Sequence, residues 1–224
     1  MKLYLIRHGE TDWNAAKKVQ GQRDIPLNEN GRRAAALTGR ALRNTEFDRI
    51  YTSPLSRARE TAELIRAGRS IPLFTDDRLR EIDFGPYEGC VVTALPESFR
   101  LFSEAPERYE APEGAESIEA LAARARSFLL EVLVPASLLP NAPKRIMVVS
   151  HGAWGQSMKL NLRGWPVSDF WKPGFPKNCS VSIFDIHGQE YEELADNRIF
   201  YPPDEAPTPL FASADVKKPL PVTE

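Results

Sequence analysis

The sequence is poor in cysteine, the residue that disulfide scaffolds and many metal centres need. Its 224 residues include two cysteines, Cys90 and Cys179, which lie far apart and lack the spacing of a zinc site. This scarcity excludes a disulfide-rich scaffold and gives no sign of a cysteine-based metal centre. We expect reduced thiols, although the sequence leaves open a single disulfide between the two.

An excess of charge of one sign is also missing. The chain has 29 lysines and arginines against 31 aspartates and glutamates, which gives a formal net charge of −2. No basic arm and no block of like charges stands out. Nucleic acids and anionic membrane surfaces are therefore not expected partners.

Long hydrophobic runs are absent as well. The first apolar stretch, "LYLI", is too short for the hydrophobic part of a secretory signal, and Arg7 ends it. No stretch reaches the length needed to span a membrane. A cytoplasmic location is therefore expected. With 42% hydrophobic residues, a chain of this length can bury an ordinary apolar core.

Strand-like and helix-like segments alternate along the chain. This alternation predicts the α/β class, as a three-layer sandwich in which helices flank a largely parallel central sheet. The clearest strand is "RIMVVS", residues 145–150, whose unbroken apolar pattern suits burial on both faces. The other predicted strands cover residues 2–6, 47–53 and 71–75, and a closing hairpin covers 179–194 with its turn at His187 and Gly188; predicted helices cover 28–44, 53–68, 118–133 and 153–164.

Capping signals mark the ends of these helices. Asn28 suits the N-cap of the first helix. For the second helix, Ser53 is predicted as the N-cap, Pro54 as the first helical residue and Gly68 as the stop. The third predicted helix follows Ser117, because apolar residues then recur at the helical period until shortly before a proline.

Two regions lack this periodic pattern. Residues 86–115 contain several prolines and aromatic residues, and we predict that they form an insertion over one end of the sheet. Residues 202–224 are rich in proline and without periodicity, as in a disordered tail or an extended strap. The predicted organisation is therefore one domain, residues 1–201, followed by that tail.

Polar side chains stand where several of the predicted strands end. Arg7 and His8 come just past the first strand, and His151 comes directly after the fourth. Arg57 lies in the first turn of the helix after the second strand, and Glu81 follows the third strand. Because parallel strands end at one edge of a sheet, where ligands bind in the crevice, we expect these five side chains to converge.

Two arginines and a histidine near helix N-termini suit a compact dianion such as phosphate. A second imidazole in the same pocket can act as a nucleophile toward phosphorus if its other nitrogen is held as a donor. Gly9 would allow close backbone approach. A nearby carboxylic acid could give the leaving alkoxide its proton. Nothing in the sequence suggests a metal site.

Five stretches, in this order, resemble the signature blocks of the histidine phosphatase superfamily, the phosphoglycerate mutase-like proteins. The similarity covers roughly residues 1–190, and its order and spacing agree with the family pattern. The blocks are "LIRHGETDWN", "QGQRDIPLNENGRRAA", "TSPLSRARETAE", "LREIDFGPYEG" and "VVSHGA". One such tripeptide would be a weak match, but five in order are specific.

This resemblance implies a role for each matching residue. His8 resembles the nucleophile that becomes phosphohistidine, and Arg7, Arg57 and His151 resemble the groups that hold the phosphoryl oxygens. Glu81 resembles the proton donor to the leaving group and later the base for water. Contacts to the phosphate or the substrate body are implied for the remaining matches, which are Asn14, Gln20 and Gly21. The family needs no metal or other cofactor.

Glu88, in "PYEG", is a second carboxylate at a family position. We interpret it as structural and favour Glu81 as the acid. His187 is interpreted as a turn residue only.

The family divides into phosphatases, in which water attacks phosphohistidine, and mutases, in which a substrate hydroxyl does so. The mutases have a long basic insertion, whereas the one here is short and carries only Arg100 and Arg108 before the next helix. "PEGAESIEALAARAR" resembles the phosphatase branch, with one extra alanine in "GAES". Ala153 also stands where mutases tend to have asparagine. These features favour hydrolysis by a metal-independent phosphomonoesterase.

Two alternatives stay open on sequence alone: a phosphoglycerate mutase, and a non-catalytic module that binds a phosphorylated ligand. The expected partner is a small phosphorylated metabolite whose identity cannot be read from the sequence, because specificity depends on loops and pocket shape. The sequence is compatible with a monomer or a homodimer.

Overall fold

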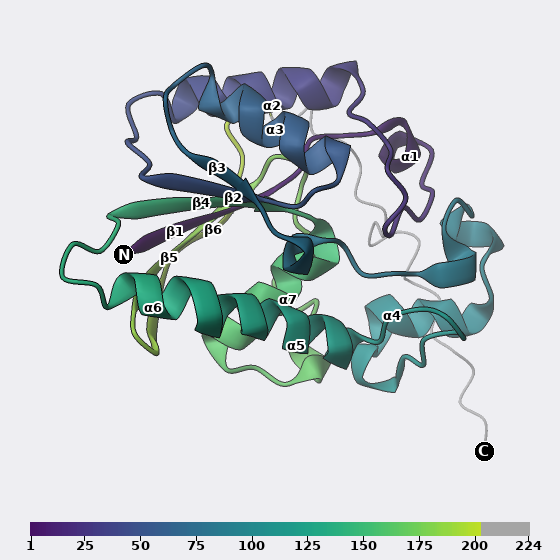
Figure 1. Ribbon diagram of the computed structural model, residues 1–224. Helices are drawn as coiled ribbons and strands as arrows, with labels where there is room; N and C mark the ends of the chain where they lie inside the picture. The colour runs from purple at the N-terminus through teal and green to yellow at the C-terminus, as the bar shows by residue number, and fades with distance from the viewer. Residues whose placement is uncertain (203–224) are drawn as a thin grey trace.

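The fold is a six-stranded sheet between two layers of helices, seen in a computed structural model that describes residues 1–202 (Figure 1). The strand order is β3-β2-β4-β1-β5-β6. The first four of these strands in space run parallel, while β5 is antiparallel to β1 and to β6. The predicted α/β sandwich with a largely parallel sheet is therefore confirmed.

The bounds of the elements follow the predicted alternation closely. The strands are β1 (Lys2–Arg7), β2 (Arg49–Thr52), β3 (Leu73–Thr75), β4 (Arg145–Ser150), β5 (Val181–His187) and β6 (Glu190–Arg198). The main helices are α2 (Glu29–Ala41), α3 (Ser56–Arg66), α5 (Ile118–Phe128) and α7 (Gly152–Arg163), and the shorter ones are α1 (Asp12–Ala15), α4 (Leu101–Glu104) and α6 (Val134–Ser137).

Each face of the sheet has its own apolar core, because both faces of the central strands carry apolar side chains. On β1, Leu3 and Leu5 pack on the side of α5 and α7, whereas Ile6 packs on the side of α3. On β4, Ile146 and Val148 likewise alternate with Met147 and Val149. Helices α2 and α3 thus cover one face, and α5, α6 and α7 cover the other (Figure 1).

The register of the two central strands fixes where their ends lie. Strand β1 pairs with β4 so that Arg7 stands opposite Ser150, and His8 donates its backbone N–H to the Ser150 carbonyl at 2.9 Å. The residues that follow both strands, His8 and His151, therefore leave the sheet side by side.

The prediction of Asn28 as an N-cap is confirmed, and Ser117, after which the third helix was predicted to begin, is the N-cap of α5. Asn28 accepts a hydrogen bond from the Gly31 N–H at 2.8 Å, and Ser117 accepts one from the Ala120 N–H at 3.1 Å. The third predicted helix is longer than its pattern suggested. Helix α5 runs through a π-helical turn, η6 (Leu129–Leu133), into α6, so that Pro135 lies near the start of α6 rather than beyond the helix.

The prediction that Ser53 caps the second helix is wrong. Helix α3 starts at Ser56, with Leu55 as its N-cap and no side-chain cap, and Pro54 lies outside it. The Ser53 hydroxyl instead lies 2.8 Å from the His151 imidazole, so the site uses the side chain that the pattern assigned to the helix. Gly68 does follow the helix closely, one residue after the left-handed Ala67.

The turn of the closing hairpin is also shifted by one residue from its prediction. His187 is the last residue of β5 and pairs with Glu190, so the two turn residues are Gly188 and Gln189. The left-handed φ of 59° at Gly188 explains why glycine starts this turn.

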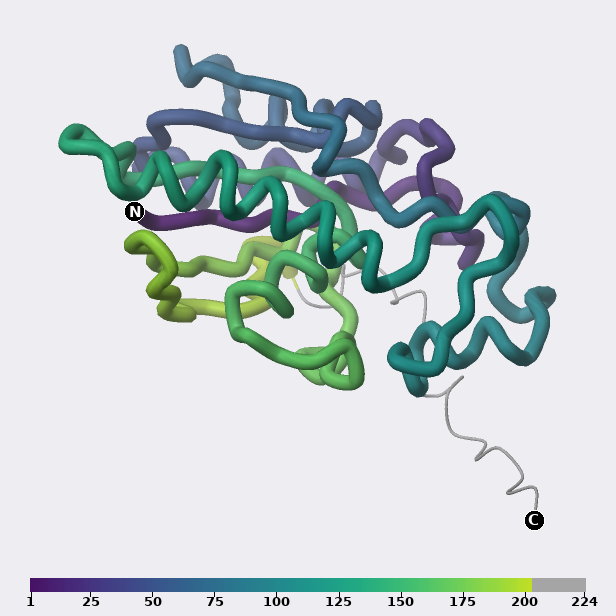
Figure 2. Tube along the Cα trace, turned by 60° about the horizontal axis from the view of Figure 1, so that its bottom comes forward, coloured from purple at the N-terminus to yellow at the C-terminus, as the bar shows by residue number. Residues whose placement is uncertain are grey.

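Residues 85–108 form short helical turns around α4, namely η2 (Gly85–Tyr87), η3 (Val92–Ala94), η4 (Glu97–Arg100) and η5 (Pro106–Arg108). Phe99, Phe102 and Tyr109 bury their rings there against one another. This segment lies beside α1, at the end of the molecule where β1 ends (Figures 1 and 2). It therefore stands over the carboxyl ends of the parallel strands. From residue 203 onward, the predicted tail (residues 202–224) lies outside the described residues.

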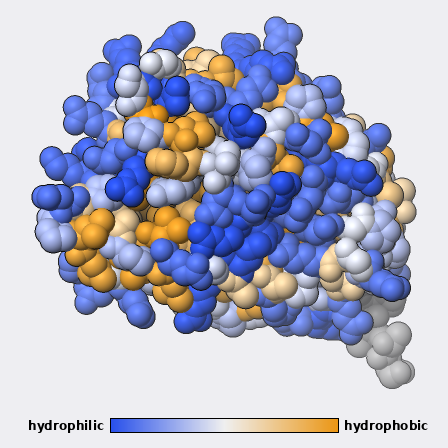
Figure 3. All heavy atoms as spheres, viewed as in Figure 1, coloured by the Kyte–Doolittle hydropathy of each residue, from blue (hydrophilic) through white to orange (hydrophobic). Residues whose placement is uncertain are grey.

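The surface in Figure 3 is largely hydrophilic, with hydrophobic residues in separate patches. Large exposed hydrophobic side chains of the described residues include Phe74, Leu138 and Leu139. Within residues 1–202 we find no helix with the length and apolar character of a membrane span. The choice between monomer and homodimer stays a prediction.

Two glycines form a matched test of the packing beneath the His8 loop. A Cβ at Gly31 of α2 would collide with the Glu10 backbone, whereas one at Gly155 of α7 would meet no atom within 4 Å. We expect Gly31→Ala to lower the free energy of unfolding by about 1–3 kcal/mol, although alanine is the better helix former. Gly155→Ala should raise it by about 0.5–1 kcal/mol. Urea unfolding measures both, and equal effects of the two changes would contradict the close approach of Gly31 to the loop.

Candidate active site

The structure brings the five predicted side chains together at the carboxyl edge of the sheet. Arg7 ends β1 and His8 follows it, while His151 links β4 to the start of α7. The His8 and His151 ring centroids lie 5.1 Å apart, with the ring planes at 62°. At the first residue of α7, a Cβ on Gly152 would lie 3.6 Å from Arg7 Nε and 3.7 Å from Glu81 Oε2, so both side chains lie close to Gly152.

His8 is buried and its hydrogen bond defines its tautomer. Its Nδ1 lies 2.6 Å from the Gly9 carbonyl oxygen, which can only accept, so Nδ1 carries the hydrogen. Burial, followed by the charges of Arg57 and Arg7, lowers the pKa of His8 well below its ordinary value. At neutral pH the ring is therefore uncharged, with a free electron pair on Nε2.

The loop that carries His8 is held from three sides. The Gly9 N–H donates to Thr61 Oγ1 at 2.9 Å, and Asn178 Nδ2 donates to the His8 carbonyl at 3.0 Å. Gly9 does serve a close approach, but to helix α2: a Cβ there would lie 2.6 Å from the Gly31 carbonyl oxygen. The peptide group between His8 and Gly9 is thus held at both its N–H and its carbonyl oxygen, next to the imidazole.

Arg57 is fully buried and Arg7 is partly buried with its Nε shielded from solvent, and backbone carbonyls hold both beside the imidazoles. Arg57 donates from Nη1 to Arg23 O at 2.7 Å and from Nη2 to Gly21 O at 2.8 Å. Arg7 donates from Nη1 to Pro176 O at 2.6 Å. Within the described residues, the Nε of each arginine is buried without a hydrogen-bond partner. Buried donors that lack a partner suit an anionic ligand.

Burial lowers the pKa of Arg57 to about 10, against the opposing effect of the nearby Glu81. Burial also lowers the pKa of Arg7, again against Glu81. Arg57 stays a cation at neutral pH because a pKa of about 10 lies well above 7. Two positive charges therefore stand beside two neutral imidazoles.

His151 is neutral for the same reason as His8. Burial, followed by the charge of Arg57, lowers the pKa of His151 well below its ordinary value. Its Nε2 lies 2.8 Å from the Ser53 hydroxyl, while its Nδ1 is buried and without a partner in the described chain. The ring is held at one nitrogen only.

Glu81 directs its carboxyl group at the N-terminus of α7. Oε1 accepts from the Trp154 N–H at 2.9 Å, and Oε2 accepts from the Ala153 N–H at 3.1 Å. These are N–H groups of the first helical turn, which have no partner inside the helix. The carboxyl group lies between this helix end and Arg7.

Of the three further predicted residues, Asn14 lies in α1, and Gln20 and Gly21 lie in the loop between α1 and α2. Asn14 and Gln20 surround Thr11, whose hydroxyl lies 3.2 Å from Asn14 Oδ1 and 2.9 Å from Gln20 Oε1. Gly21 supplies the carbonyl that Arg57 binds and has a φ of +53°, and a Cβ there would collide with the Glu88 carboxylate. Their contacts inside the protein order this loop.

Sequence reasoning missed several residues that hold the site. Ser53 contacts His151. The His8 loop is held by Thr61 and Asn178. No local sequence pattern indicates these roles. Glu88 accepts from the Gln22 and Phe84 N–H groups at 2.7 and 3.3 Å, in agreement with its structural interpretation. Burial raises the pKa of Glu88.

Among residues 1–202, no group of three or more His, Cys, Asp or Glu side chains could hold a metal ion. Cys90 and Cys179 are free thiols.

Comparison with known proteins agrees with this geometry. The family model described as histidine phosphatase superfamily (branch 1) matches residues 3–197. "Phosphoserine phosphatase 1" of Hydrogenobacter thermophilus is 34% identical over 194 residues, which cover 85% of this chain and 88% of that protein. "Probable phosphoglycerate mutase GpmB" of Yersinia pestis is 35% identical over 190 residues, or 83% of this chain and 85% of that one.

A solved structure, "Bacillus stearothermophilus YhfR", superimposes with a TM-score of 0.80 at 32% identity and covers 88% of this chain and 97% of that one. The family match thus spans the sheet, both helical layers and the residues at the strand ends. The chain therefore belongs to branch 1 of the histidine phosphatase superfamily and is a phosphatase enzyme.

Proposed function

We propose that this phosphatase hydrolyses a small phosphorylated metabolite in two steps, through a phosphohistidine formed on His8 and without a metal ion. One observation carries the proposal: the hydrogen bond from Nδ1 to the Gly9 carbonyl leaves Nε2 as a neutral nucleophile beside two buried guanidinium groups. A nucleophilic imidazole needs this tautomer, and a phosphate dianion needs this positive charge.

In the first step, His8 Nε2 attacks phosphorus, and the bond from phosphorus to the alkoxide oxygen breaks. Arg7, Arg57 and His151 hold the three remaining phosphoryl oxygens and stabilise the charge that develops on them. The Nε donors of both arginines, which lack partners within the described chain, are the groups best placed for this task.

Glu81 gives its proton to the departing alkoxide in that step. In the second step its carboxylate accepts a proton from water, and the hydroxide attacks the phosphohistidine. The nitrogen–phosphorus bond then breaks, which restores His8 and releases inorganic phosphate. Glu81 and Arg7 both lie close to Gly152, which supports this assignment because it places the carboxyl group near a proposed phosphate ligand.

Asn14, Gln20 and Gly21 are proposed to contact the phosphate or the substrate body through the loop that they order. Their polar contacts with Thr11 and Arg57 support a role in shaping this wall of the site.

Hydrolysis is favoured over phosphoglycerate mutation by the short segment over the site. Arg100 is one of its two cations before α5, and it forms an ion pair with Glu104 at 2.8 Å. Little free positive charge is therefore left to retain a bisphosphorylated intermediate. The relatives named as a phosphoserine phosphatase and a probable phosphoglycerate mutase support a small phosphorylated metabolite as the substrate. The two free thiols fit a reducing compartment such as the cytoplasm.

The first test is turnover of p-nitrophenyl phosphate in EDTA. We expect phosphate release by the wild type, and a loss of at least ~10³-fold in kcat for His8→Ala, because the nucleophile is gone. The matched control is His187→Ala on the exposed hairpin, which should keep full activity.

Rapid quenching with ³²P-labelled substrate should trap acid-labile phosphorus on His8. Label on another residue would overturn the phosphohistidine on His8. Loss of wild-type activity in EDTA would overturn the metal-free route. Bisphosphate-primed interconversion of phosphoglycerates would identify a mutase instead, and binding without turnover would identify a silent module.

The second test concerns Glu81. Glu81→Gln should lower kcat about 10²–10⁴-fold for an alkyl phosphate, because the alkoxide then leaves without general-acid assistance. The loss should be much smaller for p-nitrophenyl phosphate, whose leaving group needs no proton. Equal losses for both substrates would count against Glu81 as the acid.

The third test is thermodynamic. Burial lowers the pKa of both His8 and His151, so the folded protein binds their protons only at lower pH than the unfolded chain. Unfolding therefore takes up protons below about pH 6.5. As the pH is lowered to 5.5, the free energy of unfolding decreases by up to about 1.4 kcal/mol per histidine.

The double variant His8→Asn/His151→Asn should lack this loss in urea titrations between pH 7.5 and 5.5, whereas His187→Asn should behave as wild type. Identical pH dependence in the wild type and the double variant would show that the two rings do not stay neutral in the folded state.

A further inference from the structure

The segment that carries Glu81 has little secondary structure of its own. Between β3 and the turns over the site it contains a single 3₁₀ turn, η1 (Asp77–Leu79), and Glu81 follows two residues later. Backbone of this kind keeps a fixed position only where other elements bind its polar groups. The contacts that hold it therefore set the position of the Glu81 carboxyl group.

We propose that Arg124 of helix α5, oriented by Glu116, is a positioning residue that holds the main chain of Glu81 for proton transfer. The proposal rests on the proposed role of Glu81 as the acid. It assigns a task to the "GAES" stretch, which contains Glu116, and to a helix that contributes no group to the site itself.

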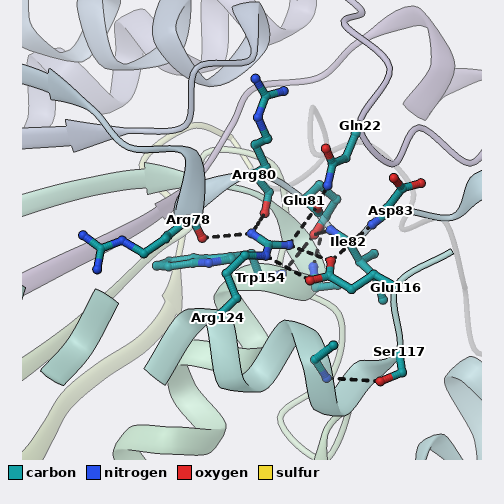
Figure 4. A network of polar contacts seen from close by, with 12 residues as sticks. Gln22, Arg78, Arg80, Glu81, Ile82, Asp83, Glu116, Ser117, Arg124 and Trp154 are labelled. Atoms are coloured by element: carbon teal, nitrogen blue, oxygen red, sulfur yellow. Dashed lines mark hydrogen bonds and ion pairs between the residues drawn. The ribbon is translucent and has the colours of Figure 1, made fainter. Parts of the chain in front are cut away.

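The guanidinium group of Arg124 binds three carbonyls of this segment. Nη1 donates to Arg78 O at 2.9 Å and to Arg80 O at 2.7 Å, and Nη2 donates to Glu81 O at 3.2 Å (Figure 4). The planar group thus forms hydrogen bonds to the main chain at Glu81 and at the residue before it. It does not touch the carboxyl group.

Glu116 fixes the plane of that guanidinium group. Arg124 Nε donates to Oε1 at 2.9 Å and Nη2 to Oε2 at 2.7 Å, which is a bidentate pair. Glu116 also binds the far side of the segment, because its N–H donates to Asp83 O at 2.8 Å and its Oε2 accepts from the Asp83 N–H at 3.4 Å. Figure 4 shows the pair lying against the chain on both sides of Glu81.

Two helices therefore hold Glu81 at different points. Helix α5 fixes its main chain through Arg124, and helix α7 fixes its carboxyl group through the N–H groups of Ala153 and Trp154. Gln22 adds a bond from Nε2 to Glu81 O at 3.3 Å. Lysine at position 124 keeps the charge but offers a single nitrogen, which cannot bind three carbonyls and a carboxylate in a fixed plane.

The test compares two leaving groups in Arg124→Lys and Glu116→Gln. For phosphoserine or 3-phosphoglycerate, whichever the wild type hydrolyses faster, we expect kcat to fall about 10–100-fold with little change in KM, because the acid is displaced. For p-nitrophenyl phosphate the fall should be less than about threefold. Arg126→Lys, two residues along on the exposed face of the same helix, should change neither rate.

A merely structural role of Arg124 would lower both rates together, in proportion to the folded fraction measured by thermal unfolding, and would overturn the proposal. Unchanged rates in both variants would overturn it as well. If Arg124→Lys does not fold, Glu116→Gln decides by the same ratio of rates. Glu81→Gln distinguishes the role of Glu81 as the acid from the positioning role of Arg124. If the rate loss in Glu81→Gln does not depend on the leaving group, the assignment of Glu81 as the acid has failed. If it does depend on the leaving group, but the losses in the Arg124 and Glu116 variants do not, only the positioning role is refuted.

Discussion

The burial of two guanidinium groups beside two imidazoles is the constraint that organises this protein. A buried charge is strongly unfavourable unless polar groups surround it. Here backbone carbonyls do so: Gly21 and Arg23 bind Arg57, and Pro176 binds Arg7. The loops on either side of the site must therefore turn their carbonyl oxygens inward, which explains their irregular course between regular elements.

The same two charges set the chemistry of the imidazoles. Together with burial they oppose a further positive charge, so both rings stay neutral. The Gly9 carbonyl then selects which nitrogen of His8 carries the hydrogen. Fold and proposed reactivity thus have one cause, because the loops whose carbonyls bind the two cationic arginines also lie around the proposed nucleophile.

Much of the fold could be predicted from the sequence because its signals are local. The unbroken apolar run of β4 and the helical period after Ser117 depend on neighbours within the same segment. Strand β4 has its predicted bounds, and helix α5 begins at the predicted residue. The convergence of His8 and His151 followed from one general property of parallel sheets, that their strands end at a common edge.

The misses have a common physical origin, since they concern contacts between distant segments. Ser53 and Pro54 look like a helix start, but the approach of His151, 98 residues away, recruits the hydroxyl. From the sequence, Arg124 resembles a solvated residue of an amphipathic helix. Only the structure shows that the Glu81 segment packs against it. The quoted blocks located the groups proposed to act on phosphate. They also contain Ser53 and Thr61, but nothing in the sequence indicates that these two side chains hold the site.

The pairing of β1 with β4 places Arg7 level with Ser150 and sets His8 one step beyond the sheet. Since both faces of β1 are apolar, side-chain burial alone discriminates weakly against a slip along the strand direction. Displacement by one residue would put the Arg7 guanidinium where the His8 imidazole now lies, and would exchange the positions of a charge and the proposed nucleophile. Catalysis is thereby tied to a single alignment of two strands, and a misthreaded chain of similar compactness would be inert.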